Sequence, residues 1–310
     1  MKRKFILLLA TFSFVMPSLS ASAGEPSTKD GKRVAHTMQP GQMTVARNTV
    51  TDYDGSGVLQ LGSSKALIIN QATGETLYAK NTDTPTPIAS VTKLMTAMVV
   101  LDAGLPMDEE ITIGKEDIDT LKGTTSRLRV GTTLPRGEML RLALMSSENR
   151  AASALARHYP GGLKAFLQHM NYKAYELGMM KTRFVDPTGL NSGNVSTAED
   201  LAKLVRAAYE YEQIRQESTA ASQEVEINGS RNPMRFINTN SLVRKGDWVI
   251  GLSKTGYISE AGRCLVMQAE IGGQPLIIVL LDSAGKMTRI GDANRIRKWI
   301  EQSYMTARMG

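Results

Sequence analysis

Apolar positions along residues 64–305 follow a strand pattern first, then a helical pattern, and then a strand pattern again. The first strands are predicted at Ser64–Asn70 and Glu75–Lys80, which the turn Gln71–Gly74 joins as a hairpin. Later strands are predicted at Gln223–Asn228, Trp248–Ile250, Arg263–Ile271 and Gln274–Leu281. The pair Gly272-Gly273 between the last two apolar runs is typical of a hairpin turn.

The stretch between these strand regions, about residues 108–217, is mainly helical in pattern. A capping arrangement marks one helix start, where Thr197 precedes the first-turn acids Glu199 and Asp200. A further helix is predicted from Asp292 to about Met305. The helices expected in the middle region are Gly137–Met145, Asn149–His158, Leu163–Gly178 and Thr197–Tyr211. The predicted fold class is therefore α+β, with an antiparallel sheet flanked by helices and an inserted all-α subdomain.

One helix stands apart because it is apolar nearly all round. Prolines at 85 and 87 forbid an earlier start, and Gly104 with Pro106 ends it. A helix that is apolar on every side is expected to be buried. This helix nevertheless opens with the hydroxyl of Ser90 and the amine of Lys93.

Ser90 and Lys93 are three residues apart, so their side chains share one face of the first helical turn. Free N–H groups and the positive end of the helix dipole favour a developing oxyanion there. Burial would also lower the pKa of the lysine and make a neutral amine available as a base. The plain alternative is that Ser90 only caps the helix and Lys93 is a solvated lysine.

Two other polar groups interrupt apolar stretches. Ser147 and Asn149 lie between two apolar helical segments, where the alternative is an ordinary helix break. Lys254-Thr255-Gly256 precedes the strand Arg263–Ile271 and offers a charge, a hydroxyl and room for a ligand near the backbone. The short motifs also have chance matches elsewhere, at Ser283–Lys286, Ser192–Asn194 and Ser230–Asn232.

The N-terminus has the organisation of a secretory signal peptide. Basic Lys2-Arg3-Lys4 is followed by an apolar run and by Ala21-Ser22-Ala23, which predicts cleavage after about Ala23. Residues 24–57 have little apolar periodicity and are predicted to be a flexible tail, before a domain at 58–310. No later segment is long and apolar enough to span a membrane, so we expect an exported protein that is soluble or at most peripheral.

Charge and composition exclude several other classes. Removal of the signal peptide lowers the formal net charge from +7 to +4, and no dense basic block argues for nucleic-acid binding. The single cysteine, Cys264, lies in an apolar run and allows no intrachain disulfide. His36, His158 and His169 lack ligand-like spacing, so neither a metal site nor a cofactor is expected.

Taken in order, the three polar groups read Ser90-Val-Thr-Lys93, Ser147-Glu-Asn149 and Lys254-Thr-Gly256. In this order the chain resembles the penicillin-recognising serine enzymes, which carry S-x-x-K, S-x-N and K-T-G motifs. The stretches around these motifs, with Asp186–Asn191 and Ala261–Cys264, are similar to the low-molecular-mass D-Ala-D-Ala carboxypeptidases and endopeptidases. The resemblance covers about residues 64–305 and implies a β-lactamase/transpeptidase-like fold.

The resemblance implies a periplasmic DD-peptidase that acts on peptidoglycan peptide stems and is acylated by β-lactams. It assigns the nucleophile to Ser90, the base to Lys93, proton relay to Ser147 and the holding of Lys93 and the substrate amide to Asn149. Substrate binding falls to Lys254, Thr255, Gly256 and Tyr257, with the N–H groups of Ser90 and Tyr257 as oxyanion hole.

Two alternatives stay open at this point. A β-lactamase would use the same motifs but needs a glutamate-bearing loop, and Glu199 and Asp200 are interpreted instead as first-turn acids. A catalytically silent protein that binds peptidoglycan stems would not need a nucleophile beside a base. The motifs leave the choice between endopeptidase and carboxypeptidase open.

Overall fold

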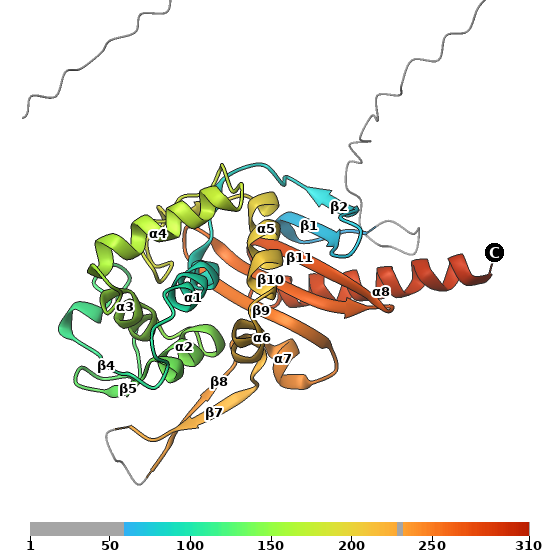
Figure 1. Ribbon diagram of the computed structural model, residues 1–310. Helices are drawn as coiled ribbons and strands as arrows, with labels where there is room; N and C mark the ends of the chain where they lie inside the picture. The colour runs from blue at the N-terminus through green and yellow to red at the C-terminus, as the bar shows by residue number, and fades with distance from the viewer. Residues whose placement is uncertain (1–58, 228–231, 310) are drawn as a thin grey trace, which may run out of the picture. The chain divides into compact units, whose positions relative to one another are not determined.

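The computed structural model describes residues 59–227 and 232–309, with an α+β architecture (Figure 1). The signal peptide expected at 1–23 and the tail expected at 24–57 lie outside these residues. The expected fold class is confirmed, because one antiparallel sheet is flanked by helices.

The main sheet has five strands, in the order β2 (Thr76–Lys80), β1 (Ser63–Asn70), β11 (Gln274–Ser283), β10 (Gly262–Ile271) and β9 (Val249–Ile258). Each neighbouring pair is antiparallel. The first hairpin of the chain joins the last strands through β1 and β11, where Leu67 lies opposite Val279. This order leaves β9 at one edge of the sheet.

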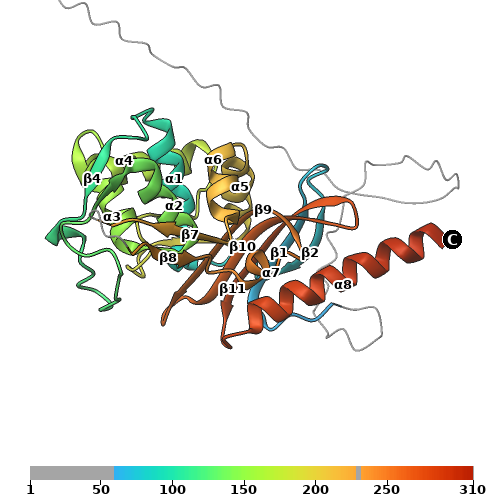
Figure 2. The ribbon, with the colours of Figure 1, turned by 90° about the horizontal axis from the view of Figure 1, so that it is seen from below.

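Helices cover both faces of this sheet. On one face, α8 (Thr288–Met309) contacts β10, β11 and β1, and Figure 2 shows it running beside the strands. On the other face, α5 (Ala198–Tyr209) packs on β11, β1 and β10, while α6 (Glu212–Thr219) packs on β9. Since neither face of β10 or β11 meets water, both strands are almost continuously apolar instead of alternating.

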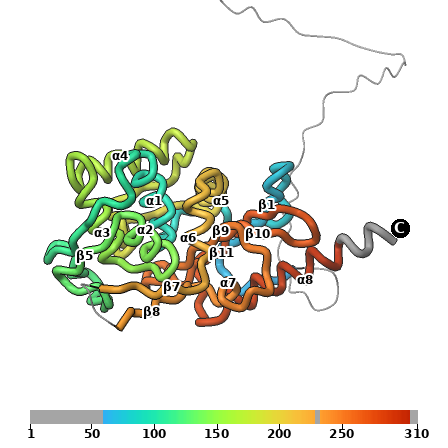
Figure 3. Tube along the Cα trace, turned by 60° about the horizontal axis from the view of Figure 1, so that its bottom comes forward, coloured from blue at the N-terminus to red at the C-terminus, as the bar shows by residue number. Residues whose placement is uncertain are grey.

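The apolar helix predicted after Ala89 lies at the centre of the helical region. It consists of a 3₁₀ turn, η1 (Ala89–Thr92), followed by α1 (Lys93–Asp102). All eight residues from Lys93 to Val100 are buried. Helices α2 (Arg136–Met145), α3 (Asn149–Arg157) and α4 (Gly162–Glu176) lie around α1, as Figure 3 shows, and α5 and α6 also contact it. The prediction of a buried helix is confirmed, and its burial comes from being enclosed by these helices.

The region 108–217 is not purely helical, which corrects one detail of the prediction. It contains the short hairpin β4 (Glu110–Thr112) and β5 (Thr133–Pro135), the 3₁₀ turn η2 (Lys115–Asp117), and β6 (Val195–Ser196), which pairs with β3 (Thr86–Pro87). Strands of two or three residues are too short to produce a readable period. In addition, α5 and α6 belong to the layer that covers the sheet.

A second correction concerns the strand that carries Lys254. The sequence predicted a strand at Trp248–Ile250 and placed Lys254-Thr255-Gly256 before the strand Arg263–Ile271, but β9 is continuous over ten residues and includes all three. Its centre holds buried polar residues, Ser253, Lys254 and Thr255, which break the apolar pattern. Strand β8 (Met234–Ile237), which pairs with β7 (Ser222–Val225), and the short helix α7 (Ser241–Lys245) were not predicted.

Among the helices of the described residues, none has the length and apolar composition that a bilayer crossing requires.

Asp292 joins the two ends of the domain, and its replacement is predicted to weaken the fold. Its buried carboxylate accepts hydrogen bonds from Gly62 N at 2.9 Å and from Ser63 N at 2.8 Å, and it pairs with Arg295. Because Asp292→Ala leaves these donors without an acceptor, we expect a loss of about 3 kcal/mol in the free energy of unfolding, measured by urea denaturation.

The control for Asp292→Ala is Glu301→Ala on the same helix. Glu301 pairs with Arg297 at 2.9 Å, and both side chains are well exposed. Removal of the Glu301 carboxylate should lower the free energy of unfolding by less than about 0.5 kcal/mol. Equal losses in the two variants would contradict the role given to Asp292.

Candidate active site

Ser90 lies in the 3₁₀ turn that precedes α1, and the backbone just before it is unusual. Ala89 has a positive φ of 48°, a left-handed conformation that is uncommon for a residue with a side chain. The turn is held by Thr92, whose hydroxyl donates to Ala89 O at 2.8 Å. No side chain caps the turn or α1, so the alternative of Ser90 as a simple helix cap is wrong.

Lys93 is buried and points at Ser90. Its side chain is 1% exposed, and Nζ lies 2.9 Å from Ser90 Oγ. The same nitrogen donates to Asn149 Oδ1 and to the main-chain oxygen of Thr188, each at 2.7 Å. The alternative of a solvated first-turn lysine is therefore wrong.

Burial lowers the pKa of Lys93 to about 7 by removing water from the ammonium form. The carboxylates of Asp186 and Glu148 oppose this effect, since a nearby negative charge favours the protonated amine. The two influences leave a large fraction of neutral amine near neutral pH, as a base beside a hydroxyl requires.

Ser147 and Asn149 come from the break between α2 and α3. Ser147 adopts a positive φ of 63°, which turns the chain sharply between the two helices. Its hydroxyl accepts a hydrogen bond from Lys254 Nζ at 2.9 Å. Asn149 begins α3, contacts Lys93 through its oxygen, and donates through Nδ2 to Thr124 Oγ1 at 3.1 Å.

Strand β9 supplies the remaining predicted residues. Lys254 is 1% exposed, and its pKa lies well below the usual value because of burial and the nearby charges of Lys93 and Arg289. Thr255 Oγ1 is 2.7 Å from Thr239 Oγ1. Tyr257 is 56% exposed, and the guanidinium of Arg263 lies 4.4 Å from its ring centroid.

A glycine is required at position 256 because β9 passes close to the turn that carries Ser90. A Cβ at this position would lie 3.0 Å from Ser90 N, Ile88 O and Ala89 Cβ, tighter than ordinary contacts. The absence of a side chain therefore lets β9 pass directly beside the N–H of Ser90. The structure thus brings all eight predicted residues to one place, where the edge strand meets the start of α1 and the α2–α3 break.

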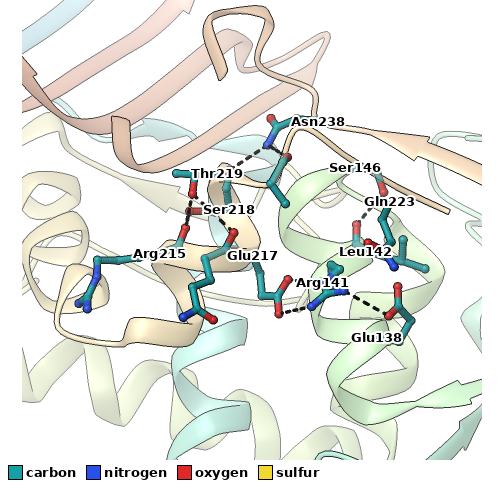
Figure 4. A network of polar contacts seen from close by, with 12 residues as sticks. Glu138, Arg141, Leu142, Ser146, Arg215, Glu217, Ser218, Thr219, Gln223 and Asn238 are labelled. Carbon is teal, nitrogen blue, oxygen red and sulfur yellow. Dashed lines mark hydrogen bonds and ion pairs between the residues drawn. The ribbon is translucent and has the colours of Figure 1, made fainter. Parts of the chain in front are cut away.

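A polar network links α2 and α6 to strand β9, and Figure 4 shows its part on α2, on α6 and at Asn238. Arg141 on α2 forms an ion pair with Glu217 on α6 at 2.5 Å. At the end of α6, Asn238 Nδ2 donates to Ser218 O at 2.9 Å, and Ser218 Oγ accepts from Ser253 N at 3.3 Å. These contacts connect the helical region to β9 one residue before Lys254.

Several residues near the site were given no role by the sequence. The carbonyl of Thr188 carries no side-chain signature, so only the folded chain reveals that it binds Lys93. Arg289 has buried Nε and Nη1 atoms without a hydrogen-bond partner in the described structure, and its charge lowers the pKa of Lys254. A lone arginine 35 residues after Lys254 offers no motif to find it by.

The loop 119–124 forms a second connection between the helical region and the sheet. Asp119 accepts hydrogen bonds from the N–H groups of Lys122 and Thr124, and Lys122 forms an ion pair with Glu260 in the β9–β10 turn. Because Thr124 also accepts a hydrogen bond from Asn149, the loop 119–124 connects the start of α3 with the β9–β10 turn.

The chance matches to the motifs have structural roles elsewhere, where the structure describes them. Ser283 is buried and pairs with Ser63 at 2.7 Å, at the junction of β1 and β11. Asn194 is buried and binds the loop behind α1. Ser230 lies outside the described residues.

Cys264 is buried, and burial raises the pKa of its thiol to about 11, which disfavours the nucleophilic thiolate. Within residues 59–227 and 232–309, no group of three or more His, Cys, Asp or Glu side chains is placed to hold a metal ion.

Comparison with known proteins gives the same family that the three sequence motifs resemble. Residues 50–285 match the family model described as D-alanyl-D-alanine carboxypeptidase. A D-alanyl-D-alanine endopeptidase of Pseudomonas aeruginosa is 49% identical over 248 residues, which cover 80% of each chain.

Two solved structures share the fold. The Streptomyces K15 DD-transpeptidase has a TM-score of 0.72 at 31% identity, covering 77% of this chain and 97% of that one. Penicillin-binding protein D2 from Listeria monocytogenes, in its ampicillin-bound form, has a TM-score of 0.67 at 29% identity, covering 78% and 98%. This chain, with its fold and its three motifs gathered at one site, belongs to the D-alanyl-D-alanine carboxypeptidase family and is a serine-type DD-peptidase.

Proposed function

We propose that residues 58–310 form the catalytic domain of an exported D-alanyl-D-alanine endopeptidase that hydrolyses peptidoglycan cross-links. The observation that carries this proposal is the buried Lys93 amine, 2.9 Å from the Ser90 hydroxyl and with a pKa of about 7. The endopeptidase name of the relative in Pseudomonas aeruginosa supports cross-links as substrates. The signal sequence at 1–23 supports a periplasmic location.

In the first half of the reaction, the Ser90 hydroxyl gives its proton to neutral Lys93 and its oxygen attacks the D-alanyl carbonyl carbon. The carbonyl oxygen becomes an oxyanion, which the N–H groups of Ser90 and Tyr257 stabilise. Gly256 supports this assignment, since its missing side chain leaves Ser90 N accessible from β9.

Collapse of the tetrahedral intermediate breaks the carbon–nitrogen bond and leaves an ester on Ser90. The leaving nitrogen needs a proton, and Ser147 relays one, supported by its 2.9 Å contact with Lys254. Water then attacks the ester carbon and gives a proton to the base, which returns it to the Ser90 oxygen as the carbon–oxygen bond of the ester breaks. Asn149 holds Lys93 through Oδ1 and is close enough to the site to bind the substrate amide.

The peptide bond to be cut is followed by a carboxylate in both terminal D-Ala-D-Ala and the cross-link. Lys254, Thr255 and Arg289 would attract this group, and the unpartnered buried nitrogens of Arg289 favour an anionic ligand. A β-lactam carries an equivalent carboxylate, which supports acylation of Ser90 by these drugs.

An efficient β-lactamase needs a carboxylate that is free to activate the water molecule for deacylation. In the loop that touches Lys93, the carboxylate of Asp186 is engaged by N–H groups of the same loop, at 2.6 Å to Thr188, 2.8 Å to Gly189 and 2.9 Å to Asn191. A carboxylate engaged in this way does not serve to activate a water molecule, so slow deacylation is expected.

The first test is intact-mass spectrometry of the protein after incubation with benzylpenicillin. We expect one persistent adduct on the wild type and none on Ser90→Ala, because the ester oxygen is missing. Rapid loss of the drug without an adduct would favour the β-lactamase, and an absence of any reaction would favour a catalytically silent binding protein.

The pH dependence of acylation follows from the lowered pKa of Lys93. Only the neutral amine accepts the serine proton, so the rate should rise with pH through about 7 and level off above it. Between pH 6 and pH 8 the neutral fraction increases roughly tenfold, and the rate of adduct formation should increase equally. A rate that is flat over this interval would contradict Lys93 as the base.

Arg289→Gln tests the anion site. For peptides that end in a D-Ala carboxylate we expect kcat/KM to fall by roughly tenfold to a hundredfold, since a charged hydrogen bond is lost. The same peptides with a terminal carboxamide serve as the control and should be affected far less. Equal losses for both peptides would assign Arg289 a purely structural role.

A further inference from the structure

The hydrogen bonds around Lys93 fix the direction of its lone pair. A neutral lysine amine has two N–H groups to donate and one lone pair to accept with. The oxygens of Asn149 and Thr188, both 2.7 Å away, are the acceptors for the two N–H groups. The lone pair is then left for the third neighbour, the hydroxyl of Ser90 at 2.9 Å. A base in this arrangement is already aligned with the proton that it removes.

The carbonyl of Thr188 is held in place by the carboxylate of Asp186. Asp186 Oδ1 accepts hydrogen bonds from Thr188 N, Thr188 Oγ1 and Gly189 N at 2.5–2.8 Å, and Oδ2 accepts from Asn191 N at 2.9 Å. Four hydrogen bonds to one carboxylate close the loop 186–191 into a tight turn, which presents its carbonyls on the side of α1.

Two consecutive carbonyls of this loop are bound by α1. Thr96 Oγ1 donates to Pro187 O at 2.6 Å, and Lys93 Nζ donates to Thr188 O. Asn194 adds a buried connection, since its Nδ2 donates to Thr92 Oγ1 at 2.9 Å and to Asp186 O at 2.8 Å. The loop is therefore attached to the turn that carries the nucleophile and to the helix that carries the base.

The loop also packs against the backbone just before Ser90. Gly189 has a φ of 84°, and a Cβ there would lie 1.9 Å from Ala89 O and 2.7 Å from Ser90 N. No side chain fits between the two segments. The strained residue Ala89 is consequently supported from behind by the loop that Asp186 closes.

We propose that Asp186 is a positioning residue for catalysis, which orients the lone pair of Lys93 toward Ser90 by fixing the carbonyl of Thr188. This inference rests on the proposed function, in which Ser90 is the nucleophile and Lys93 the base. Asp186 does not touch the reacting atoms and positions Lys93 through the loop.

The charge of Asp186 has a second, separable effect on Lys93. Charged groups face the amine from three sides, with Asp186 on the loop, Glu148 before α3 and Lys254 on β9. Burial is the largest influence and lowers the pKa of Lys93, whereas Asp186 and Glu148 raise it. Removal of the Asp186 charge must therefore lower this pKa further and move the acidic limb of the pH–rate profile to lower pH.

Two variants separate charge from position. Asp186→Asn keeps an oxygen for the three donors at Oδ1 and removes the charge, whereas Asp186→Ala removes both. The matched control is Asp119→Asn, because Asp119 also accepts four hydrogen bonds inside its own loop, from Leu121, Lys122 and Thr124. Asp119 does not contribute to the pKa shift of Lys93.

The experiment measures the rate of benzylpenicillin adduct formation from pH 5 to pH 9, on full-length protein, with thermal unfolding recorded for each variant. For Asp186→Asn we expect the acidic midpoint to fall by roughly one pH unit. For Asp186→Ala we expect the plateau rate to fall by roughly a hundredfold, because the base is misaligned. For Asp119→Asn the midpoint should stay at the wild-type value.

The inference is overturned if folded Asp186→Ala reaches the wild-type plateau, or if Asp186→Asn, which keeps the acceptor oxygen, loses as much of the plateau rate as Asp186→Ala. Failure of the proposed function has a different signature, since wild type would then show no adduct or no dependence on pH through about 7.

Discussion

The site depends on one buried amine. An ammonium group that loses contact with water is destabilised, so burial of Lys93 lowers its pKa to about 7. The same burial would be costly if the amine were left without partners, and three oxygens provide them. The same contacts therefore stabilise the buried amine and hold it in the position where it can react.

The architecture explains how this amine is kept from water. Helix α1 is enclosed by helices α2 to α6, while β9 passes its N-terminal end without a side chain at Gly256. Strand β9 is the edge strand of the five-stranded sheet and contacts the turn η1 that carries Ser90. The polar network through α6 and Ser253 holds this edge in position.

The two lysines of the site influence each other. Each is almost fully buried, and the charge of Lys93 contributes to the lowered pKa of Lys254. The hydroxyl of Ser147 accepts from Lys254, and the amine of Lys93 lies against Ser90, so each lysine is paired with a serine. With Arg289 close enough to affect Lys254, the positive potential favours an anionic group beside the bond that is cut.

The sequence by itself determined the longer strands and helices apart from β9, the burial of α1 and the eight residues that the structure brings together, because apolar periodicity and short motifs are local properties. The continuity of β9 was not predicted, because the polar residues Ser253, Lys254 and Thr255 are typical of a loop in sequence although they are buried in the strand. Only the tertiary structure decided that the carbonyl of Thr188 binds Lys93 and that Arg289 approaches Lys254. A main-chain carbonyl has no residue signature, and an electrostatic influence across 35 positions depends on how the sheet and helix α8 pack together.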